Sequence, residues 1–253
     1  ESVGAALIIL STRGEIHWGS REEDNKKIDL ILSVDHPWLE ENRLKMRIQI
    51  KSGASKGSIV DNKFKLDSSV IKDLKKIGST SCVVWVDRET GQGYWAYIHP
   101  ETRSGSHEYG MIHRISPTTL FDLARCDTRF QPGFESGGKK VIIACKNKSL
   151  KELREKAKLK YRSFGVILSP VLGNVEVTRV GWRHMFRSSR SRSGKQTSLH
   201  VIPYLDRILS NIPNDHFISD FHFESVGDYE IRSTLHILKF SDVKKTQQGE
   251  SIY

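Results

Sequence analysis

Two stretches of regular alternation constrain the fold of this chain more than any other feature. Every second residue is apolar through residues 28–34 (IDLILSV) and again through residues 44–51 (LKMRIQIK). Because successive side chains on a strand point to opposite faces, each stretch predicts a strand with one face on a core. His36-Pro37 ends the first strand, and a loop to Arg43 leads into the second, so we expect an antiparallel hairpin, and Gly53 permits a sharp turn directly after it.

Polar side chains of this hairpin are expected to converge at one edge of the sheet. If the strands pair, Asp29 lies near Gln49 and Lys51, which share a face because they are two residues apart. A carboxylate and an amide oxygen can hold Mg²⁺, which activates water and neutralises phosphate charge, while Lys51 stabilises the reacting phosphate. Glu1, on a helix predicted over residues 1–12, can supply a further carboxylate. The same spacing also fits the solvent-facing side of an ordinary hairpin.

The order of these elements resembles the PD-(D/E)XK nuclease superfamily. More narrowly, residues 1–100 resemble the bacterial family of domain of unknown function 4365, in the stretches ESVGAALIIL, EEDNKKIDL, MRIQIKSG and CVVWVDRETGQGYWAYI. That family carries Gln-x-Lys where most of the superfamily has an acidic residue before x-Lys. In this chain Lys27 stands where the family usually has a glycine.

The resemblance implies a restriction-endonuclease-like fold, in which helices flank a mixed β-sheet. It implies a catalytic set of Glu1, Asp29, Gln49 and Lys51, with Glu1, Asp29 and Gln49 as ligands of Mg²⁺ or Mn²⁺. The activity that it implies is hydrolysis of phosphodiester bonds in DNA or RNA, in phage defence or restriction. Because an amide brings no charge, Gln49 should weaken metal affinity relative to an acid. A catalytically inactive nuclease fold that only binds nucleic acid is the alternative.

We expect a chain of class α/β (α+β) with two domains. A nuclease-like domain spans residues 1–162, and a smaller basic α+β domain spans residues 163–253. The second half predicts strands at 164–170 and 174–181, a helix at 203–212, and a terminal hairpin from 221–226 and 233–240.

A basic stretch dominates this second half. Residues 177–205 contain no Asp or Glu, and the residues expected to contact nucleic acid are Arg179, Trp182, Arg183, His184, Arg187, Arg190, Arg192 and Lys195. Guanidinium groups suit phosphate contacts, the indole suits base stacking, and the Ser-Arg repetition predicts a mobile loop that orders on a polyanion. A solvated basic loop and a surface for a protein partner are equally compatible with this composition.

A metal-independent RNase site is a further alternative for the same stretch. The GWRH sequence at 181–184 is faintly similar to small toxin RNases of the barnase and RelE type. In that interpretation His184 is the general base, and the site also contains Arg183, Arg190 and Ser198.

Composition limits the classes of partner. The net charge of +10 favours a polyanion, and we expect DNA more readily than RNA. Cys82, Cys126 and Cys145 form no paired pattern, which is typical of reduced thiols in a cytoplasmic protein. No apolar run approaches the ~20 residues of a membrane span. The sequence has no P-loop, so an ATP-driven step would need an ATPase or other regulatory partner. Self-association as a homo-oligomer is also compatible with the sequence.

Overall fold

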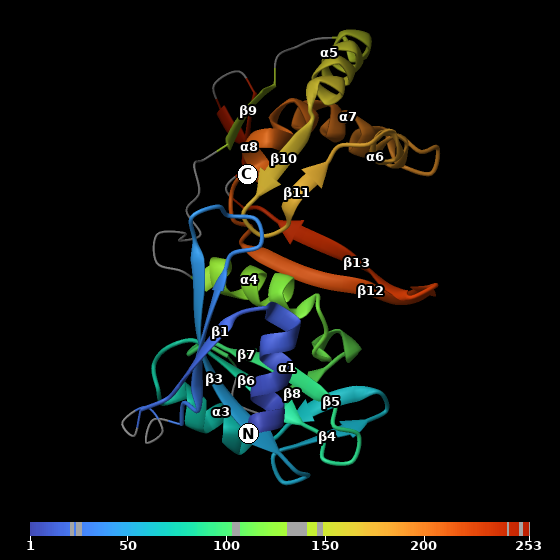
Figure 1. Ribbon diagram of the computed structural model, residues 1–253. Helices are drawn as coiled ribbons and strands as arrows, with labels where there is room; N and C mark the ends of the chain where they lie inside the picture. Colours follow the sequence, from blue (N-terminus) through green and yellow to red (C-terminus); the bar gives the residue numbers. More distant parts are fainter. Residues whose placement is uncertain are drawn as a thin grey trace. The chain divides into compact units, whose positions relative to one another are not determined.

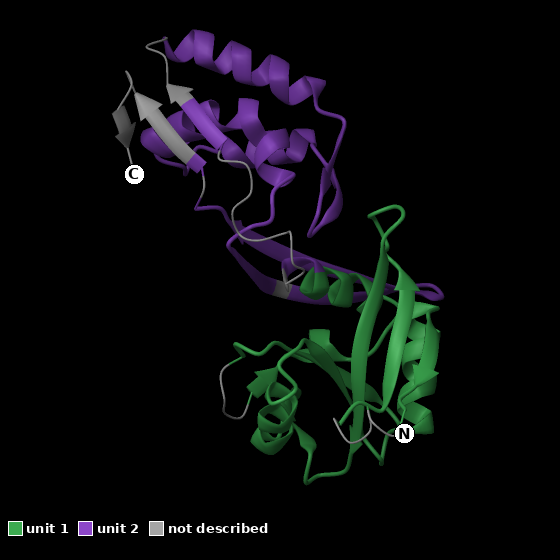
Figure 2. Cartoon of the chain, turned by 90° about the vertical axis from the view of Figure 1, so that its left-hand side faces the viewer, with its two compact units in different colours: residues 1–127 green, residues 128–253 purple. Residues whose placement is uncertain are grey.

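The fold is described from a computed structural model (Figure 1). The structure describes residues 1–20, 23, 27–102, 107–130, 141–145, 149–241, 243–247 and 250–252. The chain divides into two compact units, unit 1 at Glu1–Asp127 and unit 2 at Thr128–Tyr253 (Figure 2).

This division differs from the boundary near residue 162 that the sequence suggested. The reason is helix α5 (Leu150–Ser163), which packs within unit 2. Its Leu153, Ala157 and Tyr161 share a buried cluster with Leu199 and Ile202. The basic helix therefore belongs to the same unit as the basic stretch that follows it.

A five-stranded mixed sheet forms the centre of unit 1. Its order is β1-β2-β3-β6-β7, and only the β3–β6 pair among these neighbours is parallel. The strands are β1 (Glu15–Trp18), β2 (Leu30–Asp35), β3 (Arg43–Ser52), β6 (Ser81–Val86) and β7 (Gly93–Ile98). The β2–β3 pair confirms the expected antiparallel hairpin, with Leu30 opposite Ile48 and Val34 opposite Leu44.

Each face of this sheet buries one of two apolar clusters. Helices α1 (Ser2–Thr12) and α4 (Thr119–Phe130) contribute to the cluster that contains Leu30, Ile48 and Ile50. The opposite cluster contains residues of α3 (Ser68–Lys75) and of a small sheet formed by β4 (Gly57–Val60), β5 (Lys63–Leu66) and β8 (His107–Tyr109). A short 3₁₀ helix, η1 (Met111–His113), follows β8. The expected mixed sheet flanked by helices is therefore present.

Unit 2 combines short helices with three small sheets. After α5 come β10 (Val166–Ser169), β11 (Gly173–Glu176), α6 (Arg179–Met185), α7 (Arg192–Val201), the 3₁₀ helix η2 (Ile202–Tyr204) and α8 (Leu205–Leu209). After α8 comes a long hairpin of β12 (Asp215–Val226) and β13 (Tyr229–Lys239), which confirms and lengthens the hairpin expected near the end of the sequence. The third sheet has the order β15-β14-β9, made of β15 (Glu250–Ile252), β14 (Val243–Gln247) and β9 (Val141–Cys145).

Most of the basic stretch is helical, contrary to the expected loop, and only residues 186–191, with Arg187 and Arg190, form a turn between α6 and α7. Helices α6 and α7 each begin at a hydroxyl side chain: Thr178 accepts from the N–H of Gly181, and Ser191 accepts from the N–H of Gly194. These bonds satisfy N–H groups that the first turn of a helix leaves unpaired. The strand expected through residue 181 ends at Glu176 for the same reason. The helix expected over 203–212 is shorter, because η2 precedes α8.

Candidate functional site

Asp29 directly precedes β2, whose first residue, Leu30, pairs with Ile48 of β3. Gln49 and Lys51, two of the four expected catalytic residues, lie on one face of the central sheet because they are two residues apart on β3. This face is opposite to the one on which Ile48 is buried with α1. The structure therefore places the Asp29 carboxylate against the backbone of Ile50, the residue between Gln49 and Lys51 on β3.

The cluster beneath this face is the one that α3 covers. Gln49 pairs laterally with Val83 on β6, and Lys51 pairs with Trp85. Val83 and Trp85 both belong to the buried cluster that includes α3 side chains. The candidate residues therefore lie at the margin of a well-packed core, which holds their strand in place.

Asp29 marks the point at which β2 separates from β3. Its N–H donates to the carbonyl of Ile48 at 3.0 Å, and its Oδ2 accepts from the N–H of Ile50 at 2.5 Å. The side chain therefore supplies an acceptor that a continuing strand would supply from its backbone, which is why β2 begins at Leu30 instead of Ile28. A carboxylate has about four lone-pair sites, so contact with an N–H and contact with a cation can involve the same group.

Gln49 and Lys51 flank Ile50 on the opposite face. Gln49 is 2% exposed, and its amide takes part in no hydrogen bond between residues that the structure describes. Lys51 is half-buried, and within the same part of the chain it makes no ion pair. The Gln49 oxygen is therefore an acceptor that no described residue occupies.

Glu1 reaches the same end of the sheet from the other side. It caps α1, is exposed, and makes no side-chain capping hydrogen bond. A Cβ added at Gly4 would lie 2.6 Å from Cγ2 of Ile50, so the start of α1 rests on the end of β3 (Figure 1). Because α1 covers the face opposite Gln49 and Lys51, the structure does not place Glu1 with the other three.

The turn after β3 is fixed by two side chains that sequence reasoning missed. Nε1 of Trp85 donates to the carbonyl of Gly53 at 3.1 Å, and Oγ of Ser52 accepts from Nε and Nη2 of Arg88 at 3.2 and 3.1 Å. Gly53 has a φ of +83°, which confirms the sharp turn expected there. Arg88 thus brings a guanidinium group to Ser52 at the end of β3, one residue after Lys51.

Further cations lie on the α3 side of this end. Lys76 donates a hydrogen bond to Asp73, and this bond is the main cause that holds the pKa of Asp73 below its usual value. The charges of Lys27 and Lys56 also lower this pKa. Lys27 precedes Asp29 by two residues, and Lys56 follows Lys51 by five. Lys27 and Lys56, which are close to Asp29 and Lys51 in the sequence, therefore act on a carboxylate of α3.

The donor set fits a weakly held divalent cation. Within the described ranges there is no group of three or more His, Cys, Asp and Glu side chains able to hold a metal ion. Asp29 and Gln49 offer one carboxylate and one amide oxygen. Mg²⁺ is commonly held by one or two carboxylates, with waters and substrate phosphates as its other ligands, so this pair fits a cation that arrives with its substrate.

Three of the eight residues expected to contact nucleic acid line one pocket of unit 2. Arg179, Trp182 and Arg183 line a pocket of about 900 Å³, and its other lining residues are Lys158, Tyr161, Arg162, Phe164 and Val177. The remaining five expected contact residues, which are not in this lining, are His184, Arg187, Arg190, Arg192 and Lys195. The four cations of this pocket come from α5 and α6 together. The sequence analysis missed the two on α5, and the i, i+4 spacing of Lys158 and Arg162 is the signal that could have found them.

Two of the four residues expected in an RNase site make local helix contacts instead. Oγ of Ser198 donates to the carbonyl of Gly194 at 3.1 Å, and Nη1 of Arg190 donates to the carbonyl of Met185 at 3.3 Å. Such contacts stabilise the ends and turns of α6 and α7. No contact between His184 and these two residues accompanies them among the described residues, and the RNase alternative stays a prediction.

Comparison with known proteins adds no assignment. No family model matches the chain, and no curated protein matches its sequence. Within the described part of the chain, no helix is at once long enough and apolar enough to cross a lipid bilayer.

Proposed function

We propose that this chain is a metal-dependent nuclease with a restriction-endonuclease-like core and a reaction centre at the edge of β2 and β3. The observation that carries the proposal is the position of Asp29. The N–H of Ile50 fixes its carboxylate beside the strand that presents Gln49 and Lys51 on the same face. A carboxylate, an amide oxygen and an ammonium group at one sheet edge are the parts that phosphodiester hydrolysis needs.

Each side chain has a distinct role in this proposal. Asp29 and Gln49 hold Mg²⁺ or Mn²⁺, which supplies Lewis-acid activation of water and neutralises charge on the phosphate. Lys51 donates hydrogen bonds to a phosphate oxygen and stabilises the charge that develops in the transition state. Arg88, held at the turn by Ser52, attracts the phosphate backbone to this edge. Glu1 lies on the α1 side of β3, and it becomes a third metal ligand beside Asp29 and Gln49 if its side chain extends past the end of β3.

The amide at Gln49 predicts a preference among metals. A site with one fewer negative charge binds a cation less tightly, and Mn²⁺ accepts such sites more readily than Mg²⁺ because it is higher in the affinity order. The substrate we propose is nucleic acid, with DNA ahead of RNA, in a cytoplasmic role in phage defence or restriction. This part of the proposal comes from the resemblance of residues 1–100 and from the net charge of +10.

A nuclease fold that binds nucleic acid without cutting is the second candidate. It is favoured by the engagement of Asp29 Oδ2 with a backbone N–H and by the lack of a three-residue acidic or histidine cluster within the described residues. Cleavage separates the two. Purified protein is incubated with labelled single- and double-stranded DNA and with RNA, in Mn²⁺, Mg²⁺ or EDTA. Metal-dependent cutting that Lys51→Ala removes supports the nuclease, and binding without cutting in every metal supports the second candidate.

A further inference from the structure

The basic pocket of unit 2 is built from two helices that each present a pair of cations. Lys158 and Arg162 are one turn apart on α5, and Arg179 and Arg183 are one turn apart on α6. Residues at i and i+4 share a face of a helix, so each helix directs two positive charges into the same pocket of about 900 Å³. None of the described lining residues is acidic.

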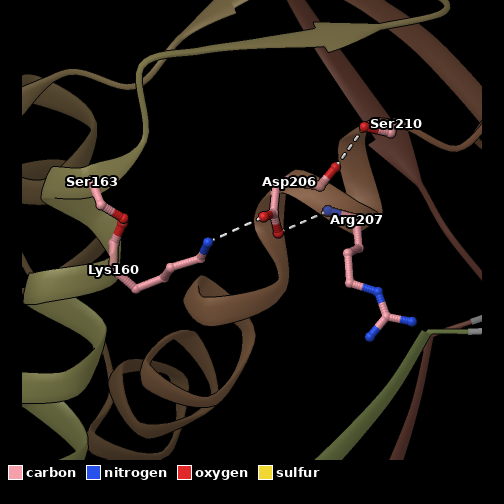
Figure 3. Close-up of polar contacts among 5 residues, drawn as sticks. All are labelled: Lys160, Ser163, Asp206, Arg207 and Ser210. Carbon is pink, nitrogen blue, oxygen red and sulfur yellow. Dashed lines mark hydrogen bonds and ion pairs between the residues drawn. The ribbon is translucent and has the colours of Figure 1, made fainter.

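Among the residues that the structure describes, these four cations make no ion pair, whereas a neighbour on α5 does. Lys160 is not one of the lining residues, and its Nζ lies 3.2 Å from Oδ2 of Asp206 (Figure 3). No ion pair between described residues involves any of the four lining cations. Like charges one turn apart repel each other, so this arrangement is unfavourable for the free protein and would be relieved by an anion.

Aromatic side chains form the apolar part of the pocket. Tyr161 is 8% exposed, its hydroxyl donates to the carbonyl of Thr178 at 2.8 Å, and its ring lies 5.2 Å from that of Trp182. A Cβ at Gly181 would lie 2.7 Å from the Tyr161 hydroxyl, so this glycine lets α6 approach α5 closely. Burial raises the pKa of Tyr161, so its hydroxyl stays neutral and adds no negative charge to the pocket.

We propose that this pocket binds one phosphorylated nucleotide of a single-stranded nucleic acid. Its phosphates contact the four cations, and its base lies against the half-buried Trp182 and Phe164. Pockets of ~300–1,000 Å³ accept small organic ligands, whereas a base-paired duplex cannot enter one without releasing a base. The choice of a strand over a free nucleotide rests on the proposed nuclease function, but the binding itself requires neither metal nor cleavage.

Binding is tested in EDTA with the full-length protein and a fluorescent six-nucleotide single strand carrying a 5′ phosphate. Anisotropy is measured against salt for wild type, for Arg162→Gln with Arg183→Gln, and for a control, Lys151→Gln with Arg154→Gln. The control removes the same charge from exposed positions outside the pocket lining. If two phosphate contacts are lost, the log–log salt slope should fall by about 1.4, at ~0.7 per contact for single strands. Affinity should fall at least ~10-fold, and the control should change both quantities much less.

Three comparisons decide the nature of the site. A blunt duplex should bind at least ~10-fold more weakly than the single strand, and adenosine monophosphate should compete better than inorganic phosphate because it adds stacking. Equal losses in both double variants would overturn the pocket, since they indicate only a diffuse positive field. Tighter binding of the mononucleotide than of the strand would overturn the single-strand assignment.

Folding and cleavage are separated from this result. The pocket variant removes one member of each like-charged pair, so its melting temperature should equal or exceed that of wild type. If binding is lost and the melting temperature falls, misfolding explains the loss. The complementary double variant, Lys158→Gln with Arg179→Gln, is then measured. If this variant is folded and its salt slope is unchanged, the proposal fails. Absence of cleavage in Mn²⁺ with intact binding in EDTA would remove the proposed function and leave the pocket assignment standing.

Discussion

Replacing Asp29 should separate its structural role from its chemical role. In Asp29→Ala, the N–H of Ile50 loses its acceptor, and Ile50 is 4% exposed. A buried donor left without a partner costs about 1–3 kcal/mol of unfolding free energy. In Asp29→Asn, the amide oxygen still accepts this N–H, and only the difference between a charged and a neutral acceptor, about 1 kcal/mol, is lost.

Both variants should lose metal-dependent cleavage, because each removes the negative charge at the proposed metal site. Stability is measured by urea denaturation followed by tryptophan fluorescence, which reports mainly on unit 1, since only Trp182 of the five tryptophans lies in unit 2. Cleavage is measured in Mn²⁺ at a temperature where all three proteins are folded. Equal stability of the Ala and Asn variants would refute the capping role of the carboxylate. Full cleavage by a folded Asn variant would refute its role as a ligand.

The remaining predictions concern the turn after β3, the metal and a buried histidine. Lys51→Ala should lower the cleavage rate by ~10²–10³ while the circular dichroism spectrum stays unchanged, because one electrostatic stabiliser is lost. EDTA should stop cleavage, and Mn²⁺ should support a higher rate than Mg²⁺ in a metal titration. Gly53→Ala should lower the free energy of unfolding by about 1 kcal/mol, measured in urea, because the φ of +83° strains a residue with a Cβ. Burial lowers the pKa of His36 to about 4, so unfolding free energy should be fully present above pH ~6.5 and should decline as the pH falls toward 4, where the imidazole must charge. Denaturation of wild type and His36→Asn across this pH window checks the assignment, because Asn can still accept the N–H groups of Trp38 and Leu39 but does not titrate.

The hairpin of the candidate site could be predicted from the sequence because its physical cause is local. Alternation with period two fixes which side chains face the core, and Leu30, Leu32 and Ile48 are all buried as that period requires. The start of β2 could not be predicted, since it depends on Asp29 replacing a backbone acceptor for Ile50 on the neighbouring strand. The position of Glu1 likewise depends on which face α1 covers, and the alternation of β3 does not specify that choice.

The pocket of unit 2 could not be predicted for a different reason. Lys158 and Arg183 are far apart in sequence and meet only because α5 and α6 pack together through Tyr161 and Trp182. The Ser-Arg composition suggested a loop, whereas burial of Leu199 stabilises a helix that composition alone does not favour. Capping hydroxyls at the starts of α6 and α7 were visible in the sequence, and they are the local signal that favours helix over loop.

The most direct test of the proposed metal site is the dependence of cleavage rate on Mn²⁺ concentration in wild type and Gln49→Glu. The substitution restores a carboxylate at the position that the amide occupies, with almost no change in side-chain volume. If Asp29 and residue 49 share a cation, the added charge should lower the half-saturating Mn²⁺ concentration by about tenfold or more, because it adds an attraction of at least ~1.4 kcal/mol. An unchanged half-saturating concentration, or cleavage that continues undiminished in EDTA, would contradict a metal site at this sheet edge.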